Sequence, residues 1–516
     1  MFHKILVFFI TITFTLLYGK EIPVSNVKEL NEAIVKAEPG DIIVMKNGTW
    51  TDVIINFSSK ANSTGPIVIS AETPGTVILN GNSKLIFSSE YLIATGLYFK
   101  DGALTGSNNA DAEKVVLFNS NNCRLTNSVI ENYNPKNNSI YYYWIFFSGN
   151  YNRVDKCTFI GKNHAGPLIC NDYSKLPNGK DSKKNIVDHC CFKNIPFDKS
   201  LDKNIFCIYG FGYNEEYTSD GAYFAIENNL FEHANGSDGE IISLRSNYNI
   251  VRNNTIRESK GAVVSRNGNF NTITGNFILG NNEQGTYGVR VSGRSIQVNN
   301  NYIYGLAGDG LILMTGEYID KSLTKDYTPL LRANTPQGRV PRYAWVRNGM
   351  FGNNTFINIE GKDIIIGEGY KEGWPFNQMI LLPENCTFIN NVIQKAKQGI
   401  AVAVQASEKK LTPKSLKFQP QKFTSNIVFR GDIQIKPVPD GIKIADPLLK
   451  LAEDGLYRPL PGSPVIGAGI EPFVDDDIDG QPRKFHSDIG ADEISPAPIA
   501  RKPLTTKLVG ASWLRE

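Results

Sequence analysis

The stretch that decides the fold reads SDGEIISLRSNYNIVRNNTIRESKGAVVSR, residues 237–266. Two short apolar runs in it end on arginines, Arg245 and Arg266, and their separation, 266 − 245 = 21, is close to the period of the surrounding sequence. If each repeat forms one coil of a stacked sheet, the two arginines lie on neighbouring rungs, about 4.8 Å apart. The acidic residues Asp238 and Glu240 then share the same patch of surface.

The pattern apolar-x-x-Asn-x-apolar recurs outward from this stretch. It is centred on Asn127, Asn229, Asn254, Asn276, Asn301 and Asn354, and the central spacings are 254 − 229 = 25, 276 − 254 = 22 and 301 − 276 = 25. Repeats of this length without helical periodicity are typical of solenoids. Asparagine suits a fixed turn because it tolerates left-handed backbone angles and its amide can hydrogen-bond along the stack. The sequence therefore predicts an all-β, right-handed parallel β-helix.

Different patterns flank the repeats. Residues 26–37, NVKELNEAIVKA, carry one apolar helical face, and Asn26 and Glu29 have capping-box spacing, so a short helix is expected to cap the first coil. We expect one β-helix domain over 20–440, a closing segment rich in Gly, Pro and Asp over 441–500, and a tail over 501–516. Asp475, Asp477 and Asp479 resemble half of an EF-hand loop, but His486 replaces the required Glu, which favours a structural turn over an ion site.

The first 19 residues read as a secretory signal, in which Lys4 precedes an apolar run over 5–17. This run is short for a membrane span, so we expect a secreted or periplasmic protein with no membrane span after processing; an uncleaved anchor is the alternative. The net charge of +3 is small and its cations do not cluster, which argues against a nucleic-acid partner. The seven cysteines are odd in number and form no CxxC pair, so buried thiols are expected.

Several motifs together carry a resemblance to a known family. They include GKNHAGP (161–167), GEIISLRS (239–246), RNNTIRES (252–259), YGVRV (287–291) and the closing GSPVIGAG (462–469) and DIGADE (488–493). In this order they resemble the alginate lyase and chondroitinase B family, polysaccharide lyase family six, over most of the chain. The resemblance implies a parallel β-helix that cleaves uronate-containing polysaccharides by β-elimination, usually with a calcium ion.

The resemblance also implies site residues. Asp238 and Glu240 stand where the family has two acidic calcium ligands, and a third ligand, often Asn, would fall near Asp202. Arg266 matches the catalytic arginine. Arg245 stands at the position of the family's lysine base, and Asn267 replaces its usual histidine.

Uronate chemistry explains these residue types. The C5 proton lies next to a carboxylate, so its removal needs a cation on that carboxylate, a base for the proton and an acid for the departing C4 oxygen. Arginine is a poor base because it stays protonated; pectate lyases, which are also β-helices, are thought to use one, and Lys260 or Tyr248 could serve instead.

Two further residues complete the predicted groove. Arg290 is expected to bind a substrate carboxylate, with pairing to Glu283 as the alternative. His164 is expected to line the groove, with a role in stabilising its turn as the alternative.

These features predict a monomeric, calcium-assisted lyase acting on an anionic polysaccharide, alginate before dermatan sulfate or chondroitin. A non-catalytic carbohydrate-binding β-helix is the second hypothesis, because Arg245 replaces the lysine base.

Overall fold

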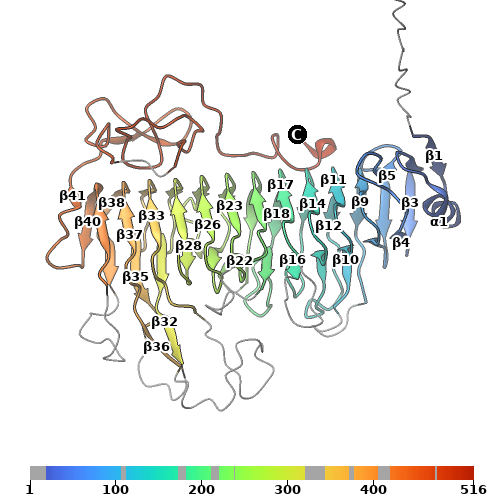
Figure 1. The fold of residues 1–516 in the computed structure, drawn as a ribbon, viewed down its shortest axis with the longest axis horizontal. Coiled ribbons are helices and arrows are strands. Elements are labelled where there is room, and N and C mark those ends of the chain that lie inside the picture. The colour runs from blue at the N-terminus through green and yellow to red at the C-terminus, as the bar shows by residue number, and fades with distance from the viewer. Residues whose placement is uncertain are drawn as a thin grey trace, which may run out of the picture.

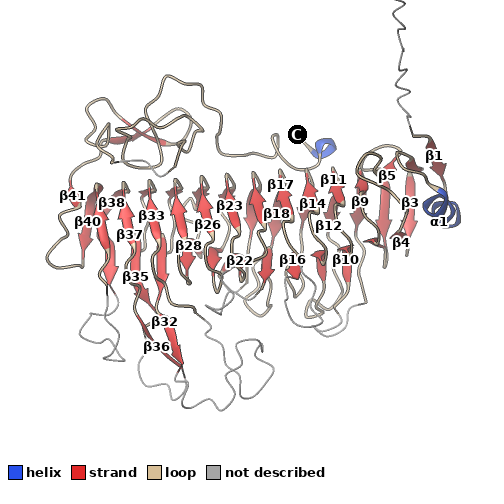
Figure 2. Cartoon of the chain, in the orientation of Figure 1, coloured by secondary structure: helices blue, strands red, loops and turns tan. Residues whose placement is uncertain are grey.

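The computed structural model describes residues 19–105, 112–172, 182–210, 220–237, 239–319, 343–370, 377–404, 419–470 and 474–515. Strands dominate this part of the chain, and its helices are α1 (Val27–Lys36) and the short 3-10 helix η5 (Ser512–Leu514) (Figure 2). No helix within these ranges is both long enough and apolar enough to span a membrane.

Three columns of parallel strands make up the body of the molecule, and the chain visits them in turn (Figure 1). The first column is a sheet of 14 strands: β1 (Glu21–Val24), β2 (Ile42–Met45), β5 (Ile67–Ala71), β8 (Leu92–Thr95), β11 (Arg124–Thr126), β14 (Arg153–Asp155), β17 (Ile186–Asp188), β20 (Ala225–Glu227), β23 (Ile250–Arg252), β26 (Thr272–Thr274), β29 (Gln297–Asn299), β33 (Met350–Gly352), β37 (Thr387–Ile389) and β39 (Lys422–Thr424).

The second column follows the first on each coil. It holds β3 (Gly48–Thr51), β6 (Val77–Asn80), β9 (Leu97–Lys100), β12 (Val129–Glu131), β15 (Thr158–Ile160), β18 (Cys191–Ile195), β21 (Leu230–Ala234), β24 (Thr255–Arg257), β27 (Phe277–Leu279), β30 (Tyr302–Tyr304) and β34 (Thr355–Ile357).

The third column carries the predicted catalytic arginines. It holds β4 (Ile54–Phe57), β7 (Lys84–Phe87), β10 (Lys114–Phe118), β13 (Tyr143–Phe147), β16 (Ile169–Asp172), β19 (Phe206–Tyr209), β22 (Glu240–Leu244), β25 (Gly261–Ser265), β28 (Thr286–Val291), β31 (Leu311–Met314) and β35 (Ile364–Glu368). The long strands β38 (Val392–Val404) and β40 (Asn426–Ile433) join columns two and three, and β41 (Ile442–Ile444) ends the stack. The predicted parallel β-helix is therefore confirmed.

A buried asparagine ladder fixes the turn between columns one and two. Asn254 Nδ2 donates to Asn276 Oδ1 at 3.0 Å, and Asn276 Nδ2 donates to Asn301 Oδ1 at 2.9 Å. The same pairing links Asn229 to Asn254 and continues through Asn354 and Asn391 to Asn426. Because each amide also satisfies backbone groups, the ladder pairs polar groups that burial would otherwise leave unsatisfied.

The two roles predicted for one asparagine fall on adjacent residues. The left-handed backbone belongs to the residue before the ladder position, such as Asn253 (φ 56°) or Asn300 (φ 57°). Asn127 is one of these left-handed residues (φ 48°), and the buried position after it is Ser128, so its prediction as a ladder residue is wrong by one position.

Apolar side chains fill the space between the columns. Phe87, Phe118 and Phe147 stack on successive rungs at 4.7 and 4.8 Å, and further stacks of buried Phe follow along the helix. All seven cysteines are buried and none of them forms a disulfide, as predicted. At the N-terminal end, α1 lies against the first coil with Leu30 and Ile34 buried, and Asn26 Oδ1 accepts a hydrogen bond from the Glu29 amide at 3.0 Å. The capping helix is confirmed.

The C-terminal segment leaves the last coil, forms the antiparallel pair β42 (Leu449–Leu451) and β43 (Tyr457–Pro459), and then runs back along the helix toward its N-terminal coils (Figure 1). The Leu504 amide donates to Thr255 Oγ1 at 2.7 Å, and Trp513 Nε1 donates to the carbonyl of Asn127 at 3.0 Å. A second antiparallel pair, β32 (Gly316–Ile319) with β36 (Asn377–Leu381), projects from the opposite side of the stack.

Candidate active site

Three arginines from neighbouring rungs of the third column meet on one carboxylate. Leu244 is paired with Ser265 in the β22–β25 register, so the residues that follow, Arg245 and Arg266, lie on adjacent rungs. Val264 is in turn paired with Arg290 of β28. The 21-residue spacing therefore places the two predicted catalytic arginines side by side, as expected.

Glu240, at the start of β22, is the carboxylate that the arginines share. Its Oε1 lies 2.6 Å from Arg290 Nη2 and 3.1 Å from Arg266 Nη1, and its Oε2 lies 3.8 Å from Arg245 Nη2. The side chain of Glu240 is 1% exposed, whereas those of the arginines are 21–24% exposed. One buried negative charge thus orders three partly exposed positive charges, and this arginine cluster presents a net charge of +2 to an anionic ligand.

Tyrosine rings lie against two of the three guanidinium groups. Arg245 Cζ lies 5.5 Å from the centroid of the Tyr209 ring, and Arg266 Cζ lies 5.8 Å from that of Tyr343. These are cation–π distances. Arg245 Nε also donates to Ser243 Oγ at 3.1 Å. Sequence reasoning missed both tyrosines, because neither lies in a recognisable motif; the position of Tyr209 one coil before Arg245 is the signal that could have found it.

Arg290 belongs to this cluster and not to the alternative ion pair considered from the sequence. Glu283 instead pairs with Lys260, at 3.2 Å between Oε1 and Nζ. Lys260 is thereby held before β25, at the opposite end of that strand from Arg266. Tyr248 lies in a stack between Tyr223 and Phe270. Neither alternative base is part of the arginine cluster.

The structure places the predicted calcium ligands differently from one another. Asp238 lies outside the described residues. Asp202 is exposed, so its prediction as a ligand beside the buried Glu240 is not supported. Asn204, two residues later, is buried and its Nδ2 donates to the backbone carbonyl of Glu240 at 3.0 Å, which makes it the better candidate.

Glu240 itself offers one oxygen to a cation. Its buried Oε2 makes no hydrogen bond to the part of the chain that the structure describes. A carboxylate oxygen and a neighbouring amide suit a hard cation such as calcium. The three guanidinium groups already neutralise this carboxylate, so a cation would compete with them for it.

Two predicted substrate-binding residues are buried. His164 has no exposed surface, stacks on Tyr142 at 3.8 Å between ring centroids, and places Nδ1 2.9 Å from the Ala165 carbonyl. Lys162, also buried, donates to the carbonyls of His164 and Gly166 at 2.7 Å. Burial lowers the pKa of both Lys162 and His164. The prediction that His164 lines the groove is therefore wrong, and its role is to stabilise the turn.

Asn267, the other predicted contact, is 1% exposed although it follows Arg266 directly. A substrate cannot touch a side chain covered to this extent, so the assignment of Asn267 to substrate binding is also wrong. Arg266 faces Glu240 while Asn267 faces inward, because successive residues of an extended chain point to opposite sides.

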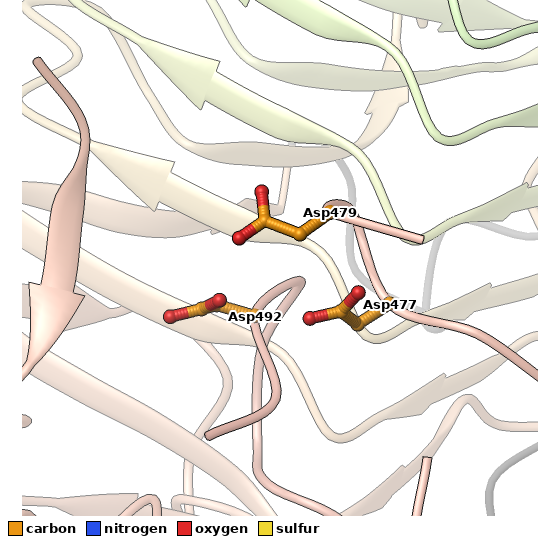
Figure 3. A group of neighbouring side chains, drawn as sticks. All are labelled: Asp477, Asp479 and Asp492. Carbon is orange, nitrogen blue, oxygen red and sulfur yellow. The ribbon is translucent and has the colours of Figure 1, made fainter. Parts of the chain in front are cut away.

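A separate group of acids lies in the C-terminal segment, where the carboxylates of Asp477, Asp479 and Asp492 converge (Figure 3). Arg458 Nη1 lies 2.7 Å from Asp479 and 2.6 Å from Asp492. Burial raises the pKa of Asp492 to about 7. This guanidinium offsets part of the negative charge of the group, and Asp477 Oδ1 accepts a hydrogen bond from the Gln481 amide at 2.7 Å, as in the structural turn favoured from the sequence.

Comparison with known proteins shows the family of this chain. The family model described as Chondroitinase B matches residues 24–460. Among solved structures, the polysaccharide lyase Pedsa3628 of family PL6 from Pseudopedobacter saltans is 40% identical, covers 95% of this chain and 99% of its own, and superposes with a TM-score of 0.74. No curated protein matches the sequence.

Two further lyases of family six are more distant relatives. AlyGC, a PL6 alginate lyase, is 25% identical over 96% of this chain and 58% of its own, with a TM-score of 0.74. A mannuronic acid specific family 6 lyase from human gut microbiota is 25% identical over 83% of this chain and 92% of its own, with a TM-score of 0.66. Because the family model matches most of its length and the PL6 lyase from Pseudopedobacter saltans is 40% identical to it, the chain belongs to the chondroitinase B family, polysaccharide lyase family six.

Proposed function

We propose that this lyase cleaves a uronate polysaccharide, alginate in preference to dermatan sulfate or chondroitin, by β-elimination at the arginine cluster. The observation that carries the proposal is the meeting of Arg245, Arg266 and Arg290 on the single buried carboxylate of Glu240. The identity to AlyGC and to the mannuronate-specific gut enzyme supports alginate as the polymer.

The cluster suits the charge that develops in this reaction. Loss of the C5 proton turns the uronate carboxylate into a dianion-like enolate, which fixed positive groups stabilise strongly in a partly dry site. A guanidinium also matches a carboxylate with two parallel hydrogen bonds. Arg290 is assigned to the substrate carboxylate. Arg266 is assigned to the departing C4 oxygen, to which it supplies positive charge and a donated hydrogen bond, while solvent water supplies the proton that makes this oxygen a hydroxyl as the C4–O bond breaks.

Arg245 is assigned to the C5 proton, which it accepts in its neutral form during turnover, since the alternatives Lys260 and Tyr248 belong to other contacts. An arginine is an unusual base, which gives the assignment a direct test. In Arg245→Lys, turnover is expected to persist with its alkaline pH dependence moved to lower pH, whereas Arg245→Met is expected to lose turnover. Equal turnover in Arg245→Met and the wild type would remove Arg245 from the mechanism.

Calcium is part of the proposal as an assisting ion that Glu240 and Asn204 would hold. When bound, it would neutralise the substrate carboxylate as a Lewis acid. Adding calcium and then a chelator during turnover tests this, and a turnover rate unchanged by the chelator would assign charge neutralisation to the arginines alone.

The second candidate is a carbohydrate-binding protein without turnover, which the arginine at the base position favours. Incubation with alginate and calcium, followed by ultraviolet absorbance of the unsaturated uronate product, separates the two. A rise supports the lyase; retained binding with no rise supports the binding protein. We also propose that the protein is a monomer and is exported to the periplasm or medium, where polymeric substrates of this kind are met.

A further inference from the structure

A line of aromatic and cationic side chains follows the corner between the third and first columns. On successive coils this corner stripe consists of Tyr151, Lys184, Tyr223, Tyr248, Phe270 and Arg294. Lys184 Nζ lies 5.3 Å from the Tyr151 ring centroid, and Arg294 Cζ lies 5.3 Å from that of Phe270. Between them, the Tyr248 ring stacks on Tyr223 at 5.1 Å and on Phe270 at 4.8 Å. Two stacked groups, Tyr151 with Lys184 and Tyr223 through Arg294, thus follow one another along the same corner on successive coils.

The aromatic residues of the stripe occupy a backbone conformation that disfavours them. Tyr223, Tyr248 and Phe270 have φ values of 48°, 59° and 58°, in the left-handed region that bulky side chains rarely adopt. At the opposite corner the chain meets the same requirement mostly with asparagine, as at Asn253 and Asn300. Asparagine would adopt this backbone with less strain, so the presence of aromatic rings indicates that the rings themselves have a role. Backbone strain of this kind concentrates at binding sites.

The charge of the stripe complements a polyanion. Lys184 is exposed and Arg294 half-buried, and neither forms an ion pair with any residue in the described ranges. Arg294 Nε is a buried donor with no hydrogen-bond partner. The next coil adds Arg347, whose guanidinium lies 4.9 Å from the Trp345 ring centroid.

The stripe lies beside the arginine cluster and extends beyond it. Tyr248, Phe270 and Arg294 follow Arg245, Arg266 and Arg290 by three, four and four residues on the same three coils. Tyr151, which is 55% exposed, and Lys184 continue the line on earlier coils, away from the cluster. A polymer held at the cluster can therefore reach the stripe, whereas a short oligosaccharide seated at the cluster need not.

We propose that the corner stripe is an accessory binding surface for an anionic polysaccharide chain. If the proposed function is taken with it, the stripe holds the polyuronate while one segment of that polymer is cleaved at the arginine cluster. Phenol hydroxyls and ring edges meet the sugar hydroxyls and C–H groups, and Lys184 and Arg294 meet carboxylates. The rung repeat of about 4.8 Å is comparable to the length of one pyranose unit, so successive rungs can meet successive sugars.

The test replaces the three stacked rings by the residue that the backbone prefers, in Tyr223→Asn/Tyr248→Asn/Phe270→Asn. Tyr91→Asn is the matched control, because Tyr91 has the same left-handed backbone (φ 58°) on the same corner but lies before the stripe. We expect the KM for polymeric alginate to rise at least fivefold in the triple variant, with kcat and the KM for a tetrasaccharide unchanged. An unchanged polymer KM, or an equal rise for polymer and tetrasaccharide, would overturn the proposal.

Retardation in an alginate-containing gel separates this inference from the proposed function, because it needs no turnover. The wild type and Tyr91→Asn are expected to migrate more slowly in the alginate gel than in a gel without alginate. The triple variant is expected to migrate at nearly the same rate in both gels. If the wild type is retarded but cleaves nothing, the lyase assignment fails and the binding surface stands. If the triple variant does not fold, the charge variant Lys184→Gln/Arg294→Gln takes its place with the same expected losses, and equal retardation of it and the wild type refutes the surface.

Discussion

Glu240→Gln tests whether one buried carboxylate organises the whole site. The substitution keeps the shape of the side chain but removes the charge that faces Arg290 at 2.6 Å and Arg266 at 3.1 Å. Removing one partner of a buried ion pair costs about 3–5 kcal/mol. The arginines are about one-fifth exposed, so water can solvate their charges in part once the carboxylate is gone. We therefore expect the free energy of unfolding to fall by about 2–3 kcal/mol.

Urea unfolding followed by circular dichroism measures this change, and Glu232→Gln is the matched control. Glu232 Oε1 accepts from Arg257 Nη1 at 2.9 Å, but 28% of its side chain is exposed. An ion pair of that kind contributes less than about 1 kcal/mol. If Glu240→Gln costs no more than Glu232→Gln, Glu240 does not organise the cluster.

The same variant has a catalytic readout. Three arginines that lose their common partner repel one another and leave their positions, and a displacement of about 1 Å can lower turnover about 100-fold. The kcat/KM of Glu240→Gln for alginate is therefore expected to fall by about that factor, and Glu232→Gln is expected to match the wild type. Full activity in the destabilised variant would show that the Glu240 carboxylate is not needed for catalysis.

Three further predictions concern the scaffold. In Asn276→Ala, the backbone amide and side chain of Asn254 lose their buried acceptor, so urea unfolding should show a loss of about 3 kcal/mol; a loss below about 1 kcal/mol would contradict the ladder. Trp513→Ala removes the contact with Tyr98 and the hydrogen bond to the chain beneath, and limited proteolysis should then cut the C-terminal segment faster, whereas an unchanged rate would show that the segment is held elsewhere. Burial raises the pKa of Asp492 to about 7 from an ordinary value of 3.8, so the folded protein keeps a proton that the unfolded chain releases, and stability falls as pH rises from about 4 to about 7. In Asp492→Asn this fall in the thermal unfolding temperature with pH should be smaller, and an equally steep fall would refute the assignment.

The sequence by itself determined the repeat and therefore the scaffold. Stacked coils place residues one period apart on neighbouring rungs, so a spacing of 21 was enough to bring Arg245 beside Arg266. Capping-box residues determine α1 in the same way, because their contacts are local. The family resemblance likewise follows from motifs that lie within single coils.

Tertiary structure alone decided which side chains face outward and what they meet. A shift of one residue along an extended chain reverses the direction of the side chain, which is why Asn267 is buried next to the partly exposed Arg266. Asn204 lies beside Glu240, and His164 is buried against Tyr142, because of contacts with other parts of the chain. Tyr209 lies on the rung before Arg245, because Ile208 is paired with Leu244, but the contact of Tyr343 with Arg266 joins parts of the chain outside the regular repeat. Loops of unequal length set those distances, and only the folded chain fixes them.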